Sequence, residues 1–268
     1  MNKSIGFIGT GNMGGALAKA AARAVAPDAL FVADKFAEKA EALAAELGCK
    51  AMAAEEIAKK CGFIVLGVKP QMLAALLQEL KPVLEARNDG FVLVSMAAGV
   101  AMADIRQMAG AEYPVIRIMP NTPVAVGQGM VLYDHTDNVS EEALAAFCDF
   151  MRFAGRLDPL PEKLIDAGSA VSGCGPAFAC LFMEALADGG VACGLPRAKA
   201  MEYAAQMLLG TAVLALESGQ HPGQMKDAVC SPGGSTIAGV RALEQCGFRA
   251  AAMNAVEAAF QRTKELGK

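Results

Sequence analysis

Residues 5–22 read IGFIGTGNMGGALAKAAA, and this stretch decides the fold of a chain of 268 residues. Ile5, Phe7 and Ile8 form a short apolar segment that predicts a buried strand, and the alanine-rich segment after Gly14 predicts a helix. Between them, Gly9, Gly11 and Gly14 match the pattern G-x-G-x-x-G. A strand that turns directly into a helix is the first half of a βαβ unit.

The three glycines have separate tasks in a turn that holds a diphosphate. Gly9 allows the tight turn, Gly11 lets the backbone approach the pyrophosphate, and Gly14 lets helix and strand pack closely. The diphosphate then lies on free N–H groups at a helix N-terminus, where the helix dipole favours an anion. A tight turn without a ligand is the alternative, and the strand–turn–helix context favours a dinucleotide site.

Strands and helices continue to alternate after this unit. The apolar runs predict strands at residues 30–34, 63–68, 91–95 and 115–119, with a helix at 37–47. This alternation predicts a doubly wound parallel sheet through about residue 125. A strand at 130–134, a helix at 140–154 and a strand at 157–160 are expected to extend the far edge of the sheet.

Strand patterns end near Pro161, and the rest of the chain predicts helices broken at 194–196, 218–223, 231–234 and Gly247. Helices at 176–192 and 196–217 are apolar nearly all round, so they need cover on every side. A small domain cannot easily supply that cover alone, which predicts a homo-oligomer; full cover within one subunit is the alternative. We expect an α/β chain with a dinucleotide-binding Rossmann domain at 1–160 and an all-α domain at 161–268.

Composition limits the kinds of partner and the compartment that are expected for this chain. A net charge of −4 and a pI near 5.4 make nucleic acid an unexpected partner. No signal peptide and no apolar run able to span a bilayer are recognised, so a cytoplasmic protein without a membrane partner is expected. The eight cysteines lack C-x-x-C or histidine spacing, so we expect no metal site and small buried thiols in a reducing compartment.

Asp34 ends the second predicted strand about 20 residues after Gly14. An acidic side chain at that place accepts hydrogen bonds from the adenosine ribose, which favours NAD. Lys35 follows and could instead meet a 2′-phosphate, so the choice between NADH and NADPH stays open. The alternative for Asp34 is an ordinary solvated turn residue.

Two further segments enter helices through glycine. In Cys230–Thr236, CSPGGST, two glycines allow the backbone unusual conformations, and hydroxyl side chains follow at the start of the next helix. Such a helix start suits a small carboxylate. A turn that only joins two helices is the alternative. In Val171–Phe178, VSGCGPAF, the following residue is Ala179, where β-hydroxyacid dehydrogenases carry a catalytic lysine. This chain therefore lacks the acid/base group that a β-hydroxyacid dehydrogenase needs.

The motifs of this chain argue against a serine hydrolase. The chain has two histidines, His135 and His221, and no G-x-S-x-G motif. His221, next to Pro222, is expected to start a helix.

Eight segments, in this order, resemble pyrroline-5-carboxylate reductases over nearly the whole chain. They are IGFIGTGNMGGALA, GVKPQ (67–71), SMAAGV (95–100), MPNTP (119–123), SGCGPAF, LADGGVACGLPR, HPGQMKD and SPGGST. The resemblance implies NAD(P)H-dependent reduction of 1-pyrroline-5-carboxylate to L-proline. It also implies a Rossmann domain, a helical dimerisation and substrate-binding domain, and dimers gathered into larger rings. A catalytically silent nucleotide-binding sensor is a further alternative, against which the intact SPGGST argues.

The resemblance also assigns site residues. The cofactor residues that it implies are Ile8, Gly9, Thr10, Gly11, Asn12, Met13, Gly14, Asp34, Lys35, Val68, Lys69, Pro70, Gln71, Met96, Ala97 and Ala98. The substrate residues that it implies are Ser231, Gly233, Gly234, Ser235 and Thr236. The substrate carboxylate would lie on the amides of 234–236, with the Thr236 hydroxyl near the imine nitrogen as the catalytic group.

Lys69 is a weaker catalytic candidate, and a capping role is at least as well supported for it. Cys174, Phe178 and Ala54 depart from residues that are frequent in the family, and none removes a group on which this chemistry depends.

Overall fold

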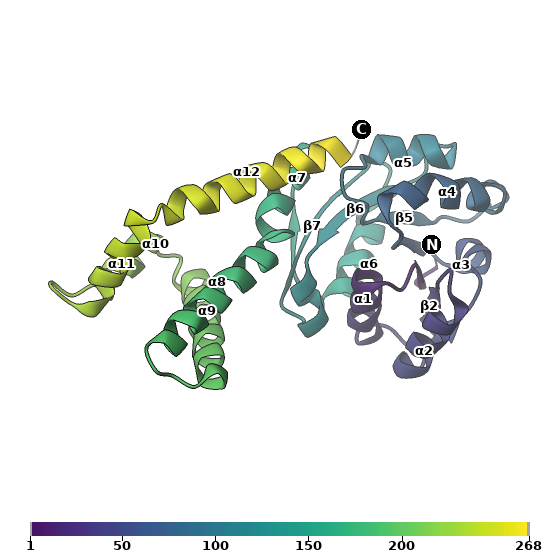
Figure 1. Ribbon diagram of the computed structural model, residues 1–268. Coiled ribbons are helices and arrows are strands. Elements are labelled where there is room, and N and C mark those ends of the chain that lie inside the picture. The colour runs from purple at the N-terminus through teal and green to yellow at the C-terminus, as the bar shows by residue number, and fades with distance from the viewer. Residues whose placement is uncertain (1, 267–268) are drawn as a thin grey trace. The chain divides into compact units, whose positions relative to one another are not determined.

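The computed structural model describes residues 2–266, which form two compact units (Figure 1). The first unit comprises the residues up to Cys174 together with those from Ala259 onward, and the second comprises Gly175–Ala258. The first unit contains a single sheet, and the described part of the second is helical. The α/β class that the sequence predicts is confirmed.

Eight strands form this sheet in the order β3-β2-β1-β4-β5-β6-β7-β8. Their bounds are β1 Ile5–Ile8, β2 Leu30–Ala33, β3 Lys50–Ala51, β4 Phe63–Leu66, β5 Val92–Ser95, β6 Val115–Pro120, β7 Gly129–His135 and β8 Gly155–Pro159. All neighbours pair in parallel except β6 and β7. Ile5 of β1 pairs with Leu30 on one side and with Phe63 on the other, so the strand order reverses direction at β1.

Helices cover both faces of the sheet. Their bounds are α1 Asn12–Ala22, α2 Ala37–Leu47, α3 Ala54–Lys60, α4 Pro70–Glu85, α5 Met102–Ala109, α6 Glu141–Met151 and α7 Glu162–Ser172. One apolar cluster joins α1, α2 and α6 to the sheet, and a second joins α3, α4 and α5. This double cover explains why the central strands are continuous apolar runs rather than alternating ones.

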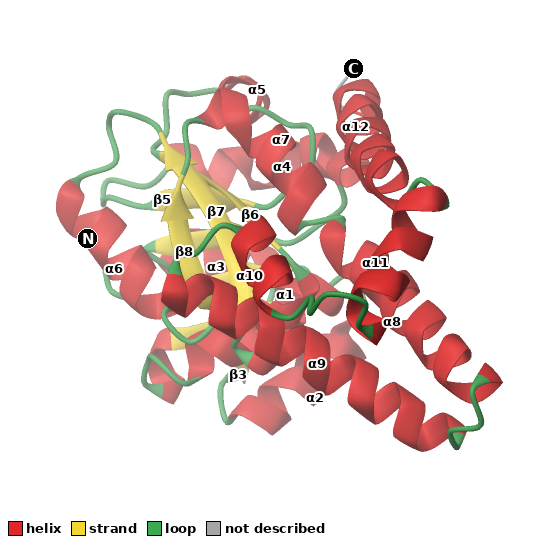
Figure 2. Cartoon of the chain, turned by 90° about the vertical axis from the view of Figure 1, so that its left-hand side faces the viewer, coloured by secondary structure: helices red, strands yellow, loops and turns green. Residues whose placement is uncertain are grey.

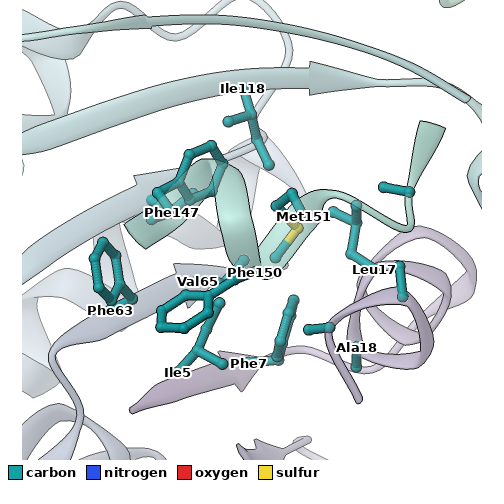
Figure 3. Packing of buried hydrophobic residues seen from close by; sticks show 14 of the residues in the cluster. Ile5, Phe7, Leu17, Ala18, Phe63, Val65, Ile118, Phe147, Phe150 and Met151 are labelled. Carbon is teal, nitrogen blue, oxygen red and sulfur yellow. The ribbon is translucent and has the colours of Figure 1, made fainter. Parts of the chain in front are cut away.

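The first cluster shows how the sheet and helices interlock (Figure 3). Phe7 of β1 and Leu17 of α1 are fully buried, and Phe147 and Phe150 come from α6. The Phe150 ring meets Phe63 of β4 edge to face at 5.1 Å between centroids. Such pairs add to the free energy of burial, so they help to hold α6 against β4, the neighbour of the strand that leads into the glycine-rich turn.

Most predicted elements are confirmed, with small shifts at their ends. The strand expected at 63–68 stops at Leu66, and Gly67 still donates its N–H to Ile8 O at 2.8 Å. The expected strand at 130–134 is longer, Gly129–His135, and the predicted edge strands at the far side are β7 and β8. The two-residue strand β3 has no counterpart in the sequence analysis.

The second unit contains no strand among its described residues (Figure 2). Its helices are α8 Gly175–Ala192, α9 Arg197–Ser218, α10 Pro222–Ala228 and α11 Ser235–Gln245, followed by the first part of α12 Phe248–Leu266. The predicted helix breaks are confirmed, and α8 packs on α9; the buried residues of these two helices are Ala187, Ala200 and Ala204. Large apolar side chains nevertheless remain exposed in the single chain, Leu216 to 75% of its surface.

The compact units divide between Cys174 and Gly175, whereas the boundary predicted from the sequence lies at 160/161. α7 packs on β6 and β7, which places it in the first unit by compactness. The boundary between functional domains at 160/161 stays a prediction.

Two other expectations are corrected. Cys61 is buried, but Cys180, Cys193 and Cys246 are exposed in the single chain, so the thiols are not uniformly buried. The helical stretch Glu162–Ala192, whose most apolar part has a mean hydropathy of 1.5, is long and apolar enough to cross a membrane by length and composition alone. The expectation that no run meets those criteria is therefore wrong, and helices that bury apolar faces against a second copy of a chain meet them too. Within residues 2–266, no group of three His, Cys, Asp or Glu side chains could hold a metal ion.

Candidate active site

The glycine-rich turn has the geometry that its spacing predicts. Gly9 has φ +102°, and a Cβ there would lie 2.6 Å from Gly67 O. A Cβ on Gly14 would lie 2.1 Å from Gly9 O, so α1 passes against the end of β1 only because Gly14 has no side chain. Gly11 differs, because a Cβ there would meet nothing within 4 Å. The space beside Gly11 is therefore open to a ligand rather than used for packing.

The start of α1 can hold an anion. Gly11 occupies its N-cap position, and no side chain caps the helix. The first N–H groups of a helix have no partner within the helix, and its dipole is positive there. An uncapped helix start beside an open glycine fits the diphosphate of a dinucleotide.

A cavity of about 430 Å³ opens at this point. It lies beside the carboxyl ends of β1, β4, β5 and β6, where ligands bind in doubly wound sheets. Its lining residues are Gly11, Asn12, Met13, Gly14, Gly67, Val68, Lys69, Met96, Met119 and Pro120.

A second open cavity of about 980 Å³ lies between α4, α5 and the loop that joins β5 to α5. Pro70, Gln71 and Ala98 line it. The predicted cofactor segments 68–71 and 96–98 are thus split between two cavities, with Lys69 and Pro70 on either side of the division. Ile8 and Ala97 have buried side chains, so only their backbone can face a ligand.

Asp34 follows β2 and reaches back to the glycine-rich turn. Its Oδ2 accepts the Thr10 N–H at 2.7 Å and the Thr10 hydroxyl at 2.9 Å, and its Oδ1 accepts the Phe36 N–H at 3.0 Å. Burial alone raises the pKa of the Asp34 carboxyl, but these donors and the charge of Lys39 outweigh it and lower the pKa below 3.8. The carboxylate is therefore ionised and already engaged by the protein.

The serine–glycine turn, residues 231–234, belongs to the second unit. Gly233 has φ +69°, a left-handed conformation that favours glycine, and Gly234 donates its N–H to Ser231 O at 3.0 Å. Gly234 is also the N-cap of α11, and no side chain caps this helix start. Ser235 and Thr236 form the first turn of α11 and are exposed in the single chain. This helix start can hold a small carboxylate on its amides.

His221 also has a defined place. Its Nδ1 accepts the Gly223 N–H at 3.1 Å and caps α10, so the prediction that His221 starts a helix is confirmed.

Comparisons with known proteins match both units of the chain. The family model for pyrroline-5-carboxylate reductase dimerisation matches residues 162–266, and the model for NADP oxidoreductase, coenzyme F420-dependent, matches residues 4–99. The pyrroline-5-carboxylate reductase of Escherichia coli K12 is 39% identical over 271 residues, covering 100% of both chains. That of Pisum sativum is 41% identical over 265 residues, covering 98% of this chain and 96% of its own. The chain belongs to the pyrroline-5-carboxylate reductase family.

A solved structure in this family extends the match to three dimensions. The Plasmodium falciparum pyrroline carboxylate reductase, determined with NADP bound, is 34% identical and superposes with a TM-score of 0.89. The alignment covers 99% of this chain and 98% of that one. The Rossmann sheet and the helical region after it are therefore the architecture of a pyrroline-5-carboxylate reductase.

Membership also explains the exposed apolar helices. A dimerisation domain buries apolar faces against a second copy, and α8 and α9 lie within the matched region. Three residues that line the smaller cavity, Gly67, Met119 and Pro120, are absent from the site residues that the sequence analysis assigns. Met119 and Pro120 end β6, and the carboxyl end of a central parallel strand is the signal that could have indicated them.

Lys69 lies at the N-cap position of α4, directly before Pro70. Its side chain makes no capping hydrogen bond with the helix, and it lines the cavity of about 430 Å³. The capping interpretation therefore has no hydrogen bond to support it, and Lys69 remains a candidate for contact with bound cofactor in this reductase.

Proposed function

We propose that this chain reduces 1-pyrroline-5-carboxylate to L-proline, with NADPH or NADH as the hydride donor. One observation carries the proposal: the same chain has two uncapped, glycine-bounded helix starts, one for a diphosphate at α1 and one for a carboxylate at α11. The full-length similarity to pyrroline-5-carboxylate reductases supports this pairing of a dinucleotide with a small carboxylate substrate.

The first unit supplies the cofactor site. Gly9–Gly14 cradle the diphosphate, and Asp34 and Lys35 lie at the adenosine ribose end. Residues 68–71 and 96–98 line the path toward the nicotinamide, together with Met119 and Pro120. The bound dinucleotide supplies the hydride that the C=N carbon accepts.

The second unit supplies the substrate site. Ser231 and Gly233 shape the turn, and the amides of Gly234, Ser235 and Thr236 hold the substrate carboxylate. The imine nitrogen must gain a proton as its carbon gains a hydride. The Thr236 hydroxyl, or a water that it orients, shares a proton with that nitrogen and makes the C=N carbon a better hydride acceptor.

The chain is proposed to act as a cytoplasmic homodimer that assembles into a larger ring. Exposed apolar residues on α8 and α9 and the match to a dimerisation domain support the dimer. The net charge of −4 supports a protein without a nucleic-acid partner, and no membrane partner is proposed. Light scattering over a range of protein concentrations measures the assembly, and a mass equal to two chains at all concentrations contradicts the ring.

Oxidation of NAD(P)H, followed optically, tests the reaction. We expect turnover with pyrroline-5-carboxylate. We expect none with small keto acids and NAD(P)H, and none with small hydroxy acids and NAD(P)+. Turnover with a hydroxy or keto acid alone indicates a hydroxyacid dehydrogenase-like enzyme, and binding of cofactor without any turnover indicates a sensor. Parallel assays with NADH and NADPH give the cofactor preference.

A further inference from the structure

Most of the hydrogen bonds to the Asp34 carboxylate come from the glycine-rich turn. Three hydrogen bonds reach it, two from Thr10 to Oδ2 and one from the Phe36 N–H to Oδ1. A carboxylate offers about four acceptor positions, two on each oxygen. Oδ2 is therefore fully used, and Oδ1 keeps one position free. Accepting both hydroxyls of an adenosine ribose would need two.

These bonds fix the peptide that lies between the first two glycines. Gly9 donates its N–H to Ala33 O at 2.7 Å, and Thr10 then donates both its N–H and its hydroxyl to the next residue along, Asp34. Thr10 is thereby held at two points to the end of β2, 24 residues away in sequence. Bonds from N–H and O–H donors to an ionised carboxylate are stronger than bonds between neutral groups.

We infer that Asp34 is a positioning residue for the diphosphate turn, which it holds through Thr10, and that it serves NADH and NADPH alike. This inference rests on the proposed use of either cofactor. The diphosphate is common to both, so loosening the turn weakens both. An acceptor for the ribose hydroxyls would instead discriminate between the two, because NADPH carries a phosphate on one of those hydroxyls.

Thr10→Val is the decisive variant, because it removes one bond to Asp34 and leaves the carboxylate and its charge in place. The probes are NADH and NADPH, titrated separately into the full-length oligomer by nicotinamide fluorescence without substrate. We expect Thr10→Val to raise both dissociation constants about fivefold, within the range for the net contribution of an ordinary hydrogen bond. Thr10→Ser keeps the hydroxyl donor and is expected to weaken binding less than Thr10→Val does.

A double-mutant cycle tests whether Thr10 and Asp34 act as one unit. Asp34→Ala is expected to raise both constants about tenfold. In the Asp34→Ala background, Thr10→Val should then cost less than about twofold, because the bond it removes is already absent. Asp28→Asn removes a carboxylate near the other end of β2 and is expected to leave both constants unchanged. Melting temperatures without cofactor show which variants fold, and Thr10→Val keeps the inference testable if Asp34→Ala does not.

Two results would overturn the inference. In one, Thr10→Val leaves NADH binding unchanged or tighter, as expected if Oδ2 were freed for the ribose. In the other, the two losses multiply in the double variant, which means that each residue contacts the cofactor independently. Because binding is measured without substrate, a failure of the proposed reaction leaves these outcomes readable.

Discussion

Arg117 of β6 lies with its Nη2 2.6 Å from Oδ1 of Asp166 on α7. The Arg117 side chain is 3% exposed, and its Nη1 also lies 3.4 Å from Oε1 of Glu162. Glu162 in turn accepts the Met102 N–H at 2.7 Å and donates its own N–H to Asp134 Oδ2 at 2.6 Å. The buried Arg117 guanidinium thus joins β6 to α7, and Glu162 extends the network to α5 and β7.

Removing a partner from this network should be costly. Among the described residues, Arg117 Nε already has no hydrogen-bond partner, so the guanidinium depends on its two carboxylates. We expect Asp166→Ala to lower the free energy of unfolding by about 2 kcal/mol, less than for a fully buried pair because Asp166 is 26% exposed. Urea unfolding at one fixed protein concentration measures this, since oligomers gain stability with concentration.

Asp149→Ala is the matched control for that experiment. Asp149 of α6 pairs with Arg152, which follows the helix as its C-cap, but the Asp149 side chain is 60% exposed. An exposed pair contributes little, so we expect a change of less than about 0.5 kcal/mol. Equal effects of the two substitutions would show that the buried network does not anchor α7.

Gly11 and Gly14 should respond differently to alanine. A Cβ on Gly14 would lie 2.1 Å from the backbone oxygen of Gly9, so Gly14→Ala is expected to destabilise the fold by about 2 kcal/mol. Gly11→Ala meets no atom within 4 Å and should destabilise the fold less than Gly14→Ala does, through the poorer N-cap residue alone. It should still weaken NADPH binding at least tenfold, about 1.4 kcal/mol, because its methyl group occupies the approach to the diphosphate. Tight NADPH binding by Gly11→Ala would place the diphosphate elsewhere.

The sequence predicts the sheet well because its signals are local. A short apolar strand, a glycine turn and a helix start are written within residues 5–22, and continuous apolar runs mark strands that are covered on both faces. The strand β3 was missed because two residues, Lys50–Ala51, are too few to form a pattern. The sequence predicts buried thiols, and the exposed ones were missed because composition does not show which cysteines the helices of the same chain cover.

The ties that position the site are long-range, and for that reason the sequence does not reveal them. Arg117 interrupts an apolar run as a single charge, and its partners Glu162 and Asp166 follow 45 and 49 residues later. Asp34 is recognisable as a residue near the cofactor from its spacing to Gly14, but its engagement by Thr10 depends on how the turn folds back. Residue type and spacing therefore indicate where a site lies. The hydrogen bonds that a site residue makes within the protein decide how many more donors, such as those of a ligand, it can accept.

The contribution of Asp34 to stability should depend on pH in one direction. Burial raises its pKa, but the bonds from Phe36 and Thr10 outweigh this and bring the folded-state pKa below 3.8. A group with a lowered folded-state pKa stabilises the protein above its ordinary pKa and loses that effect as the pH falls through the folded-state value. The difference in free energy of unfolding between wild type and Asp34→Asn should therefore be constant from about pH 8 to about pH 5 and shrink below pH 3.8.

Urea unfolding of both proteins across this pH range provides the measurement. In a Thr10→Val background the loss should be smaller and should be complete at a higher pH, because one of the bonds that lower the folded-state pKa is absent. A difference that grows as the pH falls would contradict the lowered pKa.

Thr236 should matter for turnover more than for cofactor affinity. It lies in the first turn of α11 in the second unit, whereas the glycine-rich turn belongs to the first unit. Thr236→Ala removes a hydroxyl that can share a proton with the imine nitrogen, and general acid catalysis of this kind contributes about a hundredfold or more. We expect kcat to fall by about that factor while the dissociation constant of NADPH stays within about twofold, and Thr236→Ser should restore much of kcat because it keeps the hydroxyl. Steady-state kinetics and fluorescence titration separate the two quantities. A variant that loses NADPH affinity and keeps its turnover would place Thr236 at the cofactor rather than at the imine.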